Sequence, residues 1–409
     1  MKICALTHTY PRFRRDTNGP FVEFLLEELA GRGHEIHLLT AWDEQISSVR
    51  TDKKVQLHTY RYAWPGRLHI LGYSRTIRAD ITLKFKMLLL APLMIVAGTI
   101  AFYRLVRKVK PDLLHAHWYL PNGFMASIVS RLTGVPLVAT LHGSDVFVAE
   151  KPGVYSLMTR FTNHTAKRLT SCSPELRDRI CATGFPKLMS RVIPYAVDPE
   201  LEHPVADPEI TEQLREQYEL QDCLVLLCLG RLVYKKGFEY VIRSMPELLT
   251  HYPTVRLLIA GGGDLEQELR AISRECGVEG VVIFTGELLR DKLASHLALA
   301  DVFLMPSIHD SAGNVDGLPN VILEAMAYGL PIIATEITGI PLAVQDGEKG
   351  YLIPEKDVPA LTEAVLQMLA SKERRRRYGD NSRRFIQERL NWRDVANRYE
   401  ELFEEMISE

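Results

Sequence analysis

The chain has 409 residues, of which 46% are hydrophobic and 24% charged, and its net charge is −2. Such a length is too great for one compact core and suits two domains of roughly 200 residues each in a globular protein. The six cysteines are scattered, with no Cys-x-x-Cys pair and no zinc-like Cys/His spacing, so neither a disulfide framework nor a structural metal is predicted. The first residues read as a strand rather than a signal segment, so we expect a reduced, cytoplasmic protein.

Charge is distributed unevenly along the chain. Residues 1–200 contain 27 lysines and arginines against 16 aspartates and glutamates, whereas the remainder contains 22 against 35. Halves of opposite sign support a division into two domains near residue 200. The basic first half either meets an anionic partner, such as a membrane surface or a phosphorylated acceptor, or is balanced by the acidic second half. The arginine run 374–377 is typical of a solvated helix face, so no nucleic-acid partner is predicted.

Short apolar runs alternate with helical stretches throughout the first half. A helix is expected from about Pro20 to Arg32, between two strands. This alternation predicts a doubly wound parallel sheet. The expected strands of this half are residues 2–7, 35–40, 55–60, 113–117, 136–141, 169–172 and 191–194.

Residues 87–103 form an uncharged, apolar stretch with lysines and arginines on both sides. With an internal Pro92, the stretch is short for a segment that spans a bilayer. Three structures remain open: a transmembrane span, a helix lying in a membrane interface, and a core helix of the first domain. The last two fit its length better.

The pattern of strands and helices restarts after residue 200, which predicts a second Rossmann-like half. Two such halves in tandem leave a cleft between the carboxyl ends of their sheets, where open α/β sheets bind ligands. The expected strands of the second half are residues 223–230, 255–261, 281–286, 302–306 and 331–335.

The loop 309–317 and the helix after it have the features of an anion site. Pro319 suits the first position of a helix, and Gly329 suits its end. A helix N-terminus at the carboxyl end of a strand attracts anions. Asp316 and Glu324 lie on either side of this helix start, where they could hold sugar hydroxyls.

Two cations follow the first strand of the second half. Arg231 and Lys236 lie between Gly230 and Gly237, and a pair of cations at a strand end can clamp a diphosphate. An ordinary basic turn is the alternative. The glycines of residues 261–264 lack the G-x-G-x-x-G spacing, which argues against a dehydrogenase.

In the first half, two positions face the expected cleft. Gly19 would let the backbone approach a ligand, although it could simply begin a helix. His142, beside Gly143 at a strand end, is placed for function, with a structural histidine as the alternative. His115 and His117 lie on one strand face and are expected to be structural or to line the cleft.

Several motifs, in order, resemble those of the retaining glycosyltransferases of family 4, which have the GT-B fold. The resemblance covers nearly the whole chain and rests on GRLVYKKG, LLIAGGGD, VIFTGEL, ADVFLMPS and GLPNVILEAMAYGLPIIAT in the second half, and on HAHWYLPNGF, LHGSDV and SCSPELRDRI in the first. It implies an α/β protein with two Rossmann-like doubly wound domains facing each other across a cleft. The implied domains are an acceptor-side domain, 1–197, and a nucleotide-sugar-binding domain, 198–390. The final helix, about 391–409, is expected to pack back on the first domain.

The resemblance also implies roles for individual residues. Arg231 and Lys236 match the clamp on the donor diphosphate. Glu324 matches the second acid of an E-x7-E motif, which binds the ribose. Asp316 stands at the first acid's position, which contacts the transferred sugar, and is one methylene shorter than the usual Glu. His142 matches a histidine near the reacting centre of the sugar.

Further donor contacts follow from the same resemblance. The backbone N–H groups of Asn320 and Val321 should reach the phosphates, and Gly19 matches a glycine loop near the donor phosphate. The remaining predicted donor-binding residues are Glu287, Gly317 and Leu318. The predicted catalytic set is His142, Arg231, Lys236 and Asp316.

The implied reaction moves a sugar from a nucleotide-diphosphate donor to an acceptor hydroxyl with retention of configuration. No metal or other cofactor is expected, and UDP is favoured over GDP in the donor. The expected acceptor is a glycan or a lipid-linked molecule of cell-envelope polysaccharide, exopolysaccharide or glycolipid synthesis. We expect the enzyme in the cytoplasm, with peripheral contact at the inner membrane face through its basic half. The alternatives are a GT-B sugar-nucleotide epimerase and a non-catalytic protein that binds nucleotide sugars.

Overall fold

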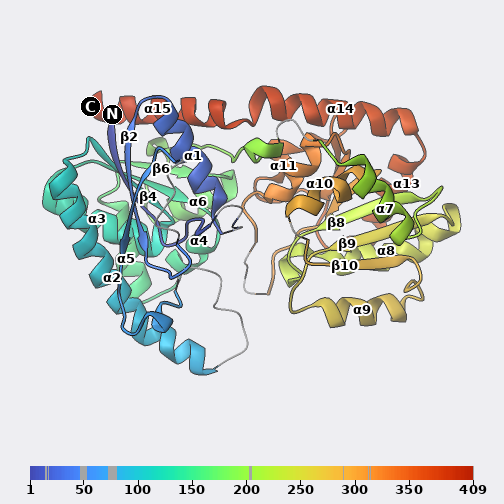
Figure 1. The fold of residues 1–409 in the computed structure, drawn as a ribbon, viewed down its shortest axis with the longest axis horizontal. Coiled ribbons are helices and arrows are strands. Elements are labelled where there is room, and N and C mark those ends of the chain that lie inside the picture. Colours follow the sequence, from blue (N-terminus) through green and yellow to red (C-terminus); the bar gives the residue numbers. More distant parts are fainter. Residues whose placement is uncertain are drawn as a thin grey trace. The chain divides into compact units, whose positions relative to one another are not determined.

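The computed structural model describes residues 1–408 except 14–15, 17, 47–52, 72–80, 202–204, 289, 312 and 314. The chain folds into two compact units (Figure 1). Unit 1 comprises Met1–Ile193 together with Trp392–Glu409, and unit 2 comprises Pro194–Asn391. Each unit is built around one parallel sheet.

The sheet of unit 1 has the strand order β3-β2-β1-β4-β5-β6-β7 in the described residues. Strands β4, β5 and β6 are buried along their whole length, and β1 and β2 are buried except at their first residue. Helices cover both faces of the sheet, which accounts for the apolar runs of the sequence. The predicted strands of the first half are confirmed. They are β1 (Lys2–Leu6), β2 (Glu35–Ala41), β3 (Gln56–Tyr60), β4 (Leu113–His117), β5 (Leu137–Leu141), β6 (Arg168–Ser171) and β7 (Ser190–Val192).

The helices of unit 1 include the last helix of the chain. In α15, Glu400 accepts hydrogen bonds from Arg32, at 2.6 Å, and pairs with His34, at 2.7 Å. Both partners directly follow α1, so the C-terminal helix is held against the first helix of the unit. The helices are α1 (Pro20–Gly31), α2 (Ile81–Val109), α3 (Phe124–Thr133), α4 (Ser144–Ala149), α5 (Val154–Asn163), α6 (Pro174–Ala182) and α15 (Trp392–Ser408).

Helix α2 contains the apolar stretch 87–103 and continues through Pro92. Within the described part of the chain, its segment Leu89–Val109 is long and apolar enough to cross a membrane, and about a third of that segment is buried. Leu90, Met94 and Phe102 contribute to the core beside the sheet. Since this face belongs to the core of an α/β unit, α2 could not cross a bilayer without leaving the sheet. The transmembrane alternative is therefore excluded.

Unit 2 has a second parallel sheet, with the order β10-β9-β8-β11-β12-β13 in the described residues. The predicted strands are confirmed as β8 (Leu224–Leu229), β9 (Val255–Ala260), β10 (Val282–Gly286), β11 (Val302–Met305) and β12 (Ile332–Thr335). The edge strand β13 (Gly350–Ile353) was not predicted. This strand is only partly buried, so its sequence lacks the continuous apolar run of a buried strand. Its first residue is a glycine because a Cβ there would lie 1.8 Å from the Ile332 carbonyl oxygen.

The helix predicted after the loop 309–317 is confirmed, with one change at its start. Pro319 is the N-cap residue, with φ −66° and ψ 117°, and the first helical residue is Asn320. Gly329 ends the helix with a φ of 72°, as expected. The helices of unit 2 are α7 (Pro208–Gln217), α8 (Phe238–His251), α9 (Glu266–Glu275), α10 (Arg290–Leu299), α11 (Asn320–Ala327), α12 (Ile340–Ala343), α13 (Val358–Leu369) and α14 (Lys372–Arg389).

Each sheet has a point where the strand order reverses. In unit 1 it lies between β1 and β4, and in unit 2 between β8 and β11. Open α/β sheets bind ligands outside the carboxyl ends of the strands at such a point. In unit 2, the loops that leave β8 and β11 carry Lys236 and Asp316, respectively.

Candidate functional site

Two lysines hold one aspartate at the reversal point of unit 2. The Nζ atom of Lys235 lies 2.6 Å from Oδ1 of Asp316, and that of Lys236 lies 2.7 Å from Oδ2. Both lysines belong to a 3-10 turn, η5 (Tyr234–Lys236), which directly follows the loop after β8. The structure thus brings the predicted residues Lys236 and Asp316 together and adds Lys235, a neighbouring cation that was not predicted as a site residue.

The Lys–Asp–Lys cluster (Lys235, Asp316 and Lys236) is largely shielded from water, with side chains only 11% to 22% exposed. Burial by itself raises the pKa of Asp316, but the two ammonium groups, Lys236 and then Lys235, outweigh it and hold this pKa well below its usual range. The carboxylate is therefore ionised at neutral pH. The cluster keeps one net positive charge.

Glycines make room for this cluster. A Cβ on Gly230 would press on Cε of Lys236 at 3.2 Å. Gly237 has a φ of +65°, and a Cβ there would lie 1.9 Å from the carbonyl oxygen of Pro306. Both positions therefore need glycine, and they let the Lys236 side chain lie close against the backbone.

Arg231 and Glu287 lie on loops at the same edge of the sheet. The Arg231 side chain is exposed, and its guanidinium forms no ion pair with any described residue. The next residue, Leu232, donates its N–H to the Gly262 carbonyl at 2.9 Å, which ties the loop after β8 to the loop after β9. The exposed Glu287 lies beside that loop, with its Cβ 3.7 Å from where a Cβ on Gly262 would be.

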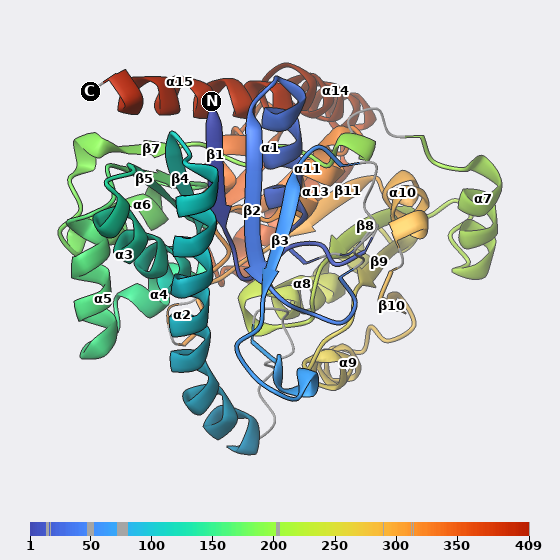
Figure 2. The same cartoon turned by 60° about the vertical axis from the view of Figure 1, so that its left-hand side comes forward.

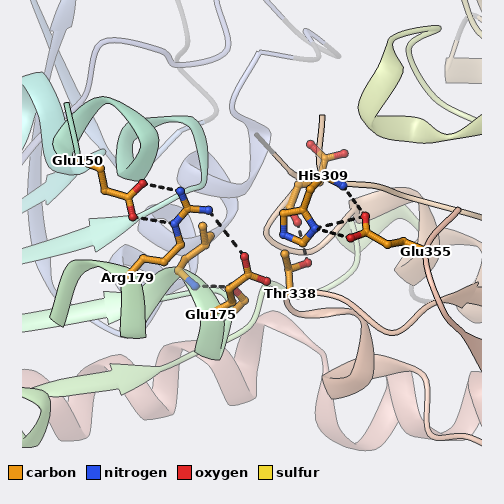
Figure 3. Close-up of polar contacts among 9 residues, drawn as sticks. Glu150, Glu175, Arg179, His309, Thr338 and Glu355 are labelled. Carbon is orange, nitrogen blue, oxygen red and sulfur yellow. Dashed lines mark hydrogen bonds and ion pairs between the residues drawn. The ribbon is translucent and has the colours of Figure 1, made fainter. Parts of the chain in front are cut away.

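The turn before α11 is fixed by the segment after β12. The hydroxyl of Thr338 donates to the Asp316 carbonyl at 2.7 Å (Figure 3). The N–H of Gly339 donates to the Gly317 carbonyl, also at 2.7 Å. Gly317 and Leu318 are buried, so these contacts hold the turn within the unit and position the helix start.

One face of α11 carries three polar side chains at four-residue spacing, namely Asn320, Glu324 and Tyr328. Burial, with a contribution from the Glu324 charge, raises the pKa of the Tyr328 phenol. The Asn320 Oδ1 and the Tyr328 hydroxyl are buried and have no hydrogen-bond partner within the described residues. The first N–H groups of the helix, those of Asn320 and Val321, have no partner inside it. This face therefore offers hydrogen-bonding groups to a ligand.

A histidine–glutamate pair anchors the loop after β11 to the segment after β13. The backbone N–H of His309 donates to Glu355 Oε2 at 2.8 Å, and the His309 ring lies 3.2 Å from the other carboxylate oxygen (Figure 3). Glu355 is not among the predicted site residues because it follows β13, the strand that was not predicted. The pair restrains the start of the loop that carries Asp316.

In unit 1, Gly19 and His142 lie at one edge of the sheet. Gly19 is the N-cap of α1 with a φ of 67°, and a Cβ there would be 3.2 Å from the Thr9 carbonyl oxygen. The ring of Phe21, in the first turn of α1, is centred 4.8 Å from the His142 ring. The structure therefore brings these two predicted residues to the same region of unit 1.

His142 belongs to a cluster of imidazoles that are neutral at neutral pH. Its Nε2 lies 3.2 Å from Nδ1 of His117. Burial lowers the pKa of His8 to about 4 and that of His115 to about 3, and it holds the pKa of His117 and of His142 well below the usual value. Among the described residues, no group of three or more His, Cys, Asp or Glu side chains could hold a metal ion. His142 thus presents a neutral ring.

Asp145 fixes the backbone beside His142, a role that was not predicted from the sequence. Its buried carboxylate accepts the N–H groups of His142, at 3.1 Å, Gly143, at 2.8 Å, and Tyr119, at 2.6 Å. Burial raises the pKa of Asp145 in spite of these hydrogen bonds. Gly143 has a φ of 125°, which only glycine adopts readily. The His-Gly-Ser-Asp order was the available signal.

Helix α4, which starts directly after Gly143, is also held at its far end. Arg179 of α6 donates from Nε to Glu150 at 2.8 Å and lies 3.8 Å from Glu175 (Figure 3). Its guanidinium also lies 4.2 Å from the centre of the Phe147 ring. The segment that carries His142 is therefore restrained from both sides.

Family models match both parts of the chain. The model "Glycosyltransferase Family 4" matches residues 20–201, and "Glycosyl transferases group 1" matches residues 210–385. The chain is 33% identical over 303 residues to the GDP-mannose-dependent alpha-(1-6)-phosphatidylinositol monomannoside mannosyltransferase of Mycolicibacterium smegmatis, which covers 73% of this chain and 78% of the relative. The chain belongs to glycosyltransferase family 4. It is also 24% identical over 384 residues to the N-acetyl-alpha-D-glucosaminyl L-malate synthase of Bacillus anthracis, across 93% of this chain and 92% of that one.

Solved structures agree with the GT-B fold of this family 4 protein. Sucrose-phosphate synthase from Thermosynechococcus elongatus aligns over all of both chains, with a TM-score of 0.75 and 22% identity. HepE from Anabaena, solved in complex with UDP, aligns over 99% of this chain and 100% of its own, with a TM-score of 0.74 and 17% identity. The protein is thus a GT-B glycosyltransferase that acts on nucleotide sugars.

Proposed function

We propose that this glycosyltransferase transfers a hexosyl residue, with retention, from a nucleotide-diphosphate donor bound at the carboxyl edge of the unit 2 sheet. The observation that carries this proposal is the Lys–Asp–Lys cluster, with its net positive charge, beside the start of α11. Arg231 adds a second cation that no described side chain neutralises. As the diphosphate leaves, these cations and the helix dipole stabilise the charge that develops on it.

Asp316 has two partners in this proposal. A diphosphate competes with its carboxylate for Lys236, because both are anions that bind the same ammonium group. The carboxylate then accepts a hydrogen bond from a hydroxyl of the transferred sugar, while Lys235 continues to orient it. This division of labour compensates for the shorter side chain of Asp316.

The polar face of α11 suits the ribose of the donor. The Glu324 carboxylate accepts hydrogen bonds from ribose hydroxyls, and the buried Asn320 Oδ1 and Tyr328 hydroxyl lie on the same face. The N–H groups of Asn320 and Val321 bind the phosphates. The family resemblance supports Gly19 and His142 of unit 1 as further donor contacts in this proposal.

The donor that we propose first is GDP-mannose. UDP is the donor nucleotide expected from the sequence, but the relatives at 33% identity are named as GDP-mannose-dependent, whereas the UDP-bound neighbour shares 17% identity. The acceptor of those relatives, phosphatidylinositol monomannoside, is a lipid, which supports a lipid-linked acceptor for this enzyme. We place the reaction in the cytoplasm, at the inner face of the membrane.

The test is a transfer assay with a donor panel. Purified protein is incubated with GDP-mannose, UDP-glucose or UDP-N-acetylglucosamine and with a lipid extract, and the anomeric configuration of the product is read by NMR. Lys236→Ala should lower transfer by about 100-fold or more, because one charged contact to the leaving group is lost. Lys187→Ala, at a lysine 62% exposed in unit 1, is the control and should leave transfer unchanged.

Other outcomes would replace the proposal. Interconversion of the donor without any acceptor would indicate an epimerase. Donor binding without transfer or hydrolysis would indicate a non-catalytic binding protein. Equal activity of Lys236→Ala and wild type would remove the proposed donor site, and an inverted product would remove the retaining mechanism.

A further inference from the structure

Helix α2 is apolar on two sides, and only one of them is used by the core. Leu90, Met94, Phe102, Leu105 and Val106 are each less than 10% exposed and pack in the core of unit 1. A helix at the surface of an α/β unit normally presents polar side chains on its other face. The outer face of α2 departs from this rule.

Four large apolar side chains line that outer face. Leu89, Leu93, Val96 and Ile100 are 58%, 53%, 58% and 46% exposed, respectively. Their spacing of four, three and four residues places them in one row along the helix. We call this row the α2 stripe. Single exposed apolar side chains are common, but a continuous row of four is typical of an interaction surface.

The charges around the α2 stripe have one sign. Helix α2 contains five lysines and arginines and no acidic residue. Arg104 and Arg107 continue the row of the stripe by one and two turns. Both are exposed, and neither forms an ion pair with another described residue. The outer face of α2 is therefore an apolar row that leads into a cationic end.

The apolar row and the cations of α2 together indicate which kind of partner this face binds. Two copies of α2 packed side by side would bring cations against cations in the antiparallel and the parallel arrangement alike, because the helix has cations near both ends and no acid. A bilayer span is excluded by the core contacts of the inner face. We propose that the α2 stripe inserts into the interface of an anionic lipid surface, with Arg104 and Arg107 at the headgroups.

The position of α2 in unit 1 relates the proposed lipid contact to the edge of the sheet that carries the candidate site residues. Figure 2 shows the first turns of α2 extending beyond the ends of strands β2 and β3, on the side of the sheet where the strands end. Gly19 and His142 lie at that same edge of the unit 1 sheet. A surface held by α2 would present lipid-borne molecules to this edge. The lipid contact itself does not depend on the identity of the donor.

Vesicle flotation tests the proposal with the full chain. Wild-type protein should float with vesicles of phosphatidylglycerol and phosphatidylcholine, and less with phosphatidylcholine alone. The triple variant Leu93→Ser, Val96→Ser and Ile100→Ser should partition at least about tenfold less, because three apolar side chains no longer enter the interface. The control is Leu188→Ser, at a fully exposed leucine beside the edge strand β7, and it should float like wild type.

A charge variant and two independent measurements complete the test. Arg104→Gln with Arg107→Gln should weaken binding only to the anionic vesicles, and high salt should do the same to wild type. The proposal is overturned if wild type does not float, if the triple variant floats equally well, or if sedimentation velocity shows that the stripe holds two copies together. Binding of GDP and UDP, measured by calorimetry, should be unchanged in the triple variant, so failure here is distinguishable from failure of the proposed donor site.

Discussion

At the scale of single residues, Asp316 decides how the cations of the donor site are used. Replacing Asp316 by Asn keeps the shape but removes the charge that Lys235 and Lys236 share. We expect Asp316→Asn to bind nucleoside diphosphate more tightly, by about threefold to tenfold, because both ammonium groups become available to phosphate. Transfer should nevertheless fall, since the sugar loses a charged acceptor. Calorimetry and turnover measurements separate these two effects, and a variant that loses both affinity and turnover would contradict this account.

The same substitution has a pH signature. The lysines hold the pKa of Asp316 below its ordinary value of 3.8, so the folded protein favours the carboxylate more than the unfolded chain does. The stability from this ion pair is present above about pH 4 and is lost as the pH falls below it. The free energy of unfolding of wild type should therefore exceed that of Asp316→Asn at pH 7, and the two should converge in acid. A constant difference across this range would show that the lysines do not stabilise the carboxylate.

His8 gives unit 1 a pH dependence of its own. Burial lowers its pKa from 6.5 to about 4, so between these values the unfolded chain binds more protons than the folded one. Stability should fall as the pH falls from 6.5 toward 4, by about 3 kcal/mol for this residue. Urea unfolding of His8→Gln should show a shallower pH dependence than wild type. An identical dependence in the two proteins would mean that His8 is not buried in its neutral form.

At the scale of elements, the turn between β8 and α8 depends on one glycine. Gly237→Ala places a Cβ against the Pro306 carbonyl and also forces alanine into a left-handed conformation. We expect a loss of unfolding free energy of at least about 3 kcal/mol, with a displaced Lys236. Gly277→Ala is the matched control, because Gly277 has a φ of +68° but nothing within 4 Å of the added Cβ, and it should lose only about 1 kcal/mol. Equal losses in urea unfolding would show that the close approach to Pro306 has no role.

At the scale of the whole molecule, the chain leaves unit 1 after Ile193 and returns to it at Trp392. Phe403 of α15 is fully buried. Phe403→Ala should therefore destabilise unit 1 by about 3–5 kcal/mol, although the substitution lies over 200 residues from the rest of that unit. Calorimetric unfolding should show one transition moved to lower temperature. Glu401→Ala, at an exposed position of α15, is the control, and a similar shift in both variants would argue against packing as the cause.

Local sequence patterns were sufficient to predict the described strands other than β13, the helix after the loop 309–317 and the family. These features depend on local patterns, namely apolar runs, glycine positions and ordered motifs. The strand β13 escaped because a partly buried edge strand that begins with glycine lacks that pattern, and Glu355 escaped with it. The apolar pattern of α2 likewise did not determine whether the helix packs in the core or contacts a membrane, since the pattern does not show which side of the helix meets the sheet.

The pairing of the polar groups became visible in the folded structure. Lys235 and Asp316 are 81 residues apart and meet because β8 and β11 are neighbours at the reversal point of the sheet. The shared carboxylate, the neutral histidines around His142 and the exposed row on α2 all depend on which residues are buried together. Burial and charge pairing are properties of the folded arrangement, so no local pattern could have shown them.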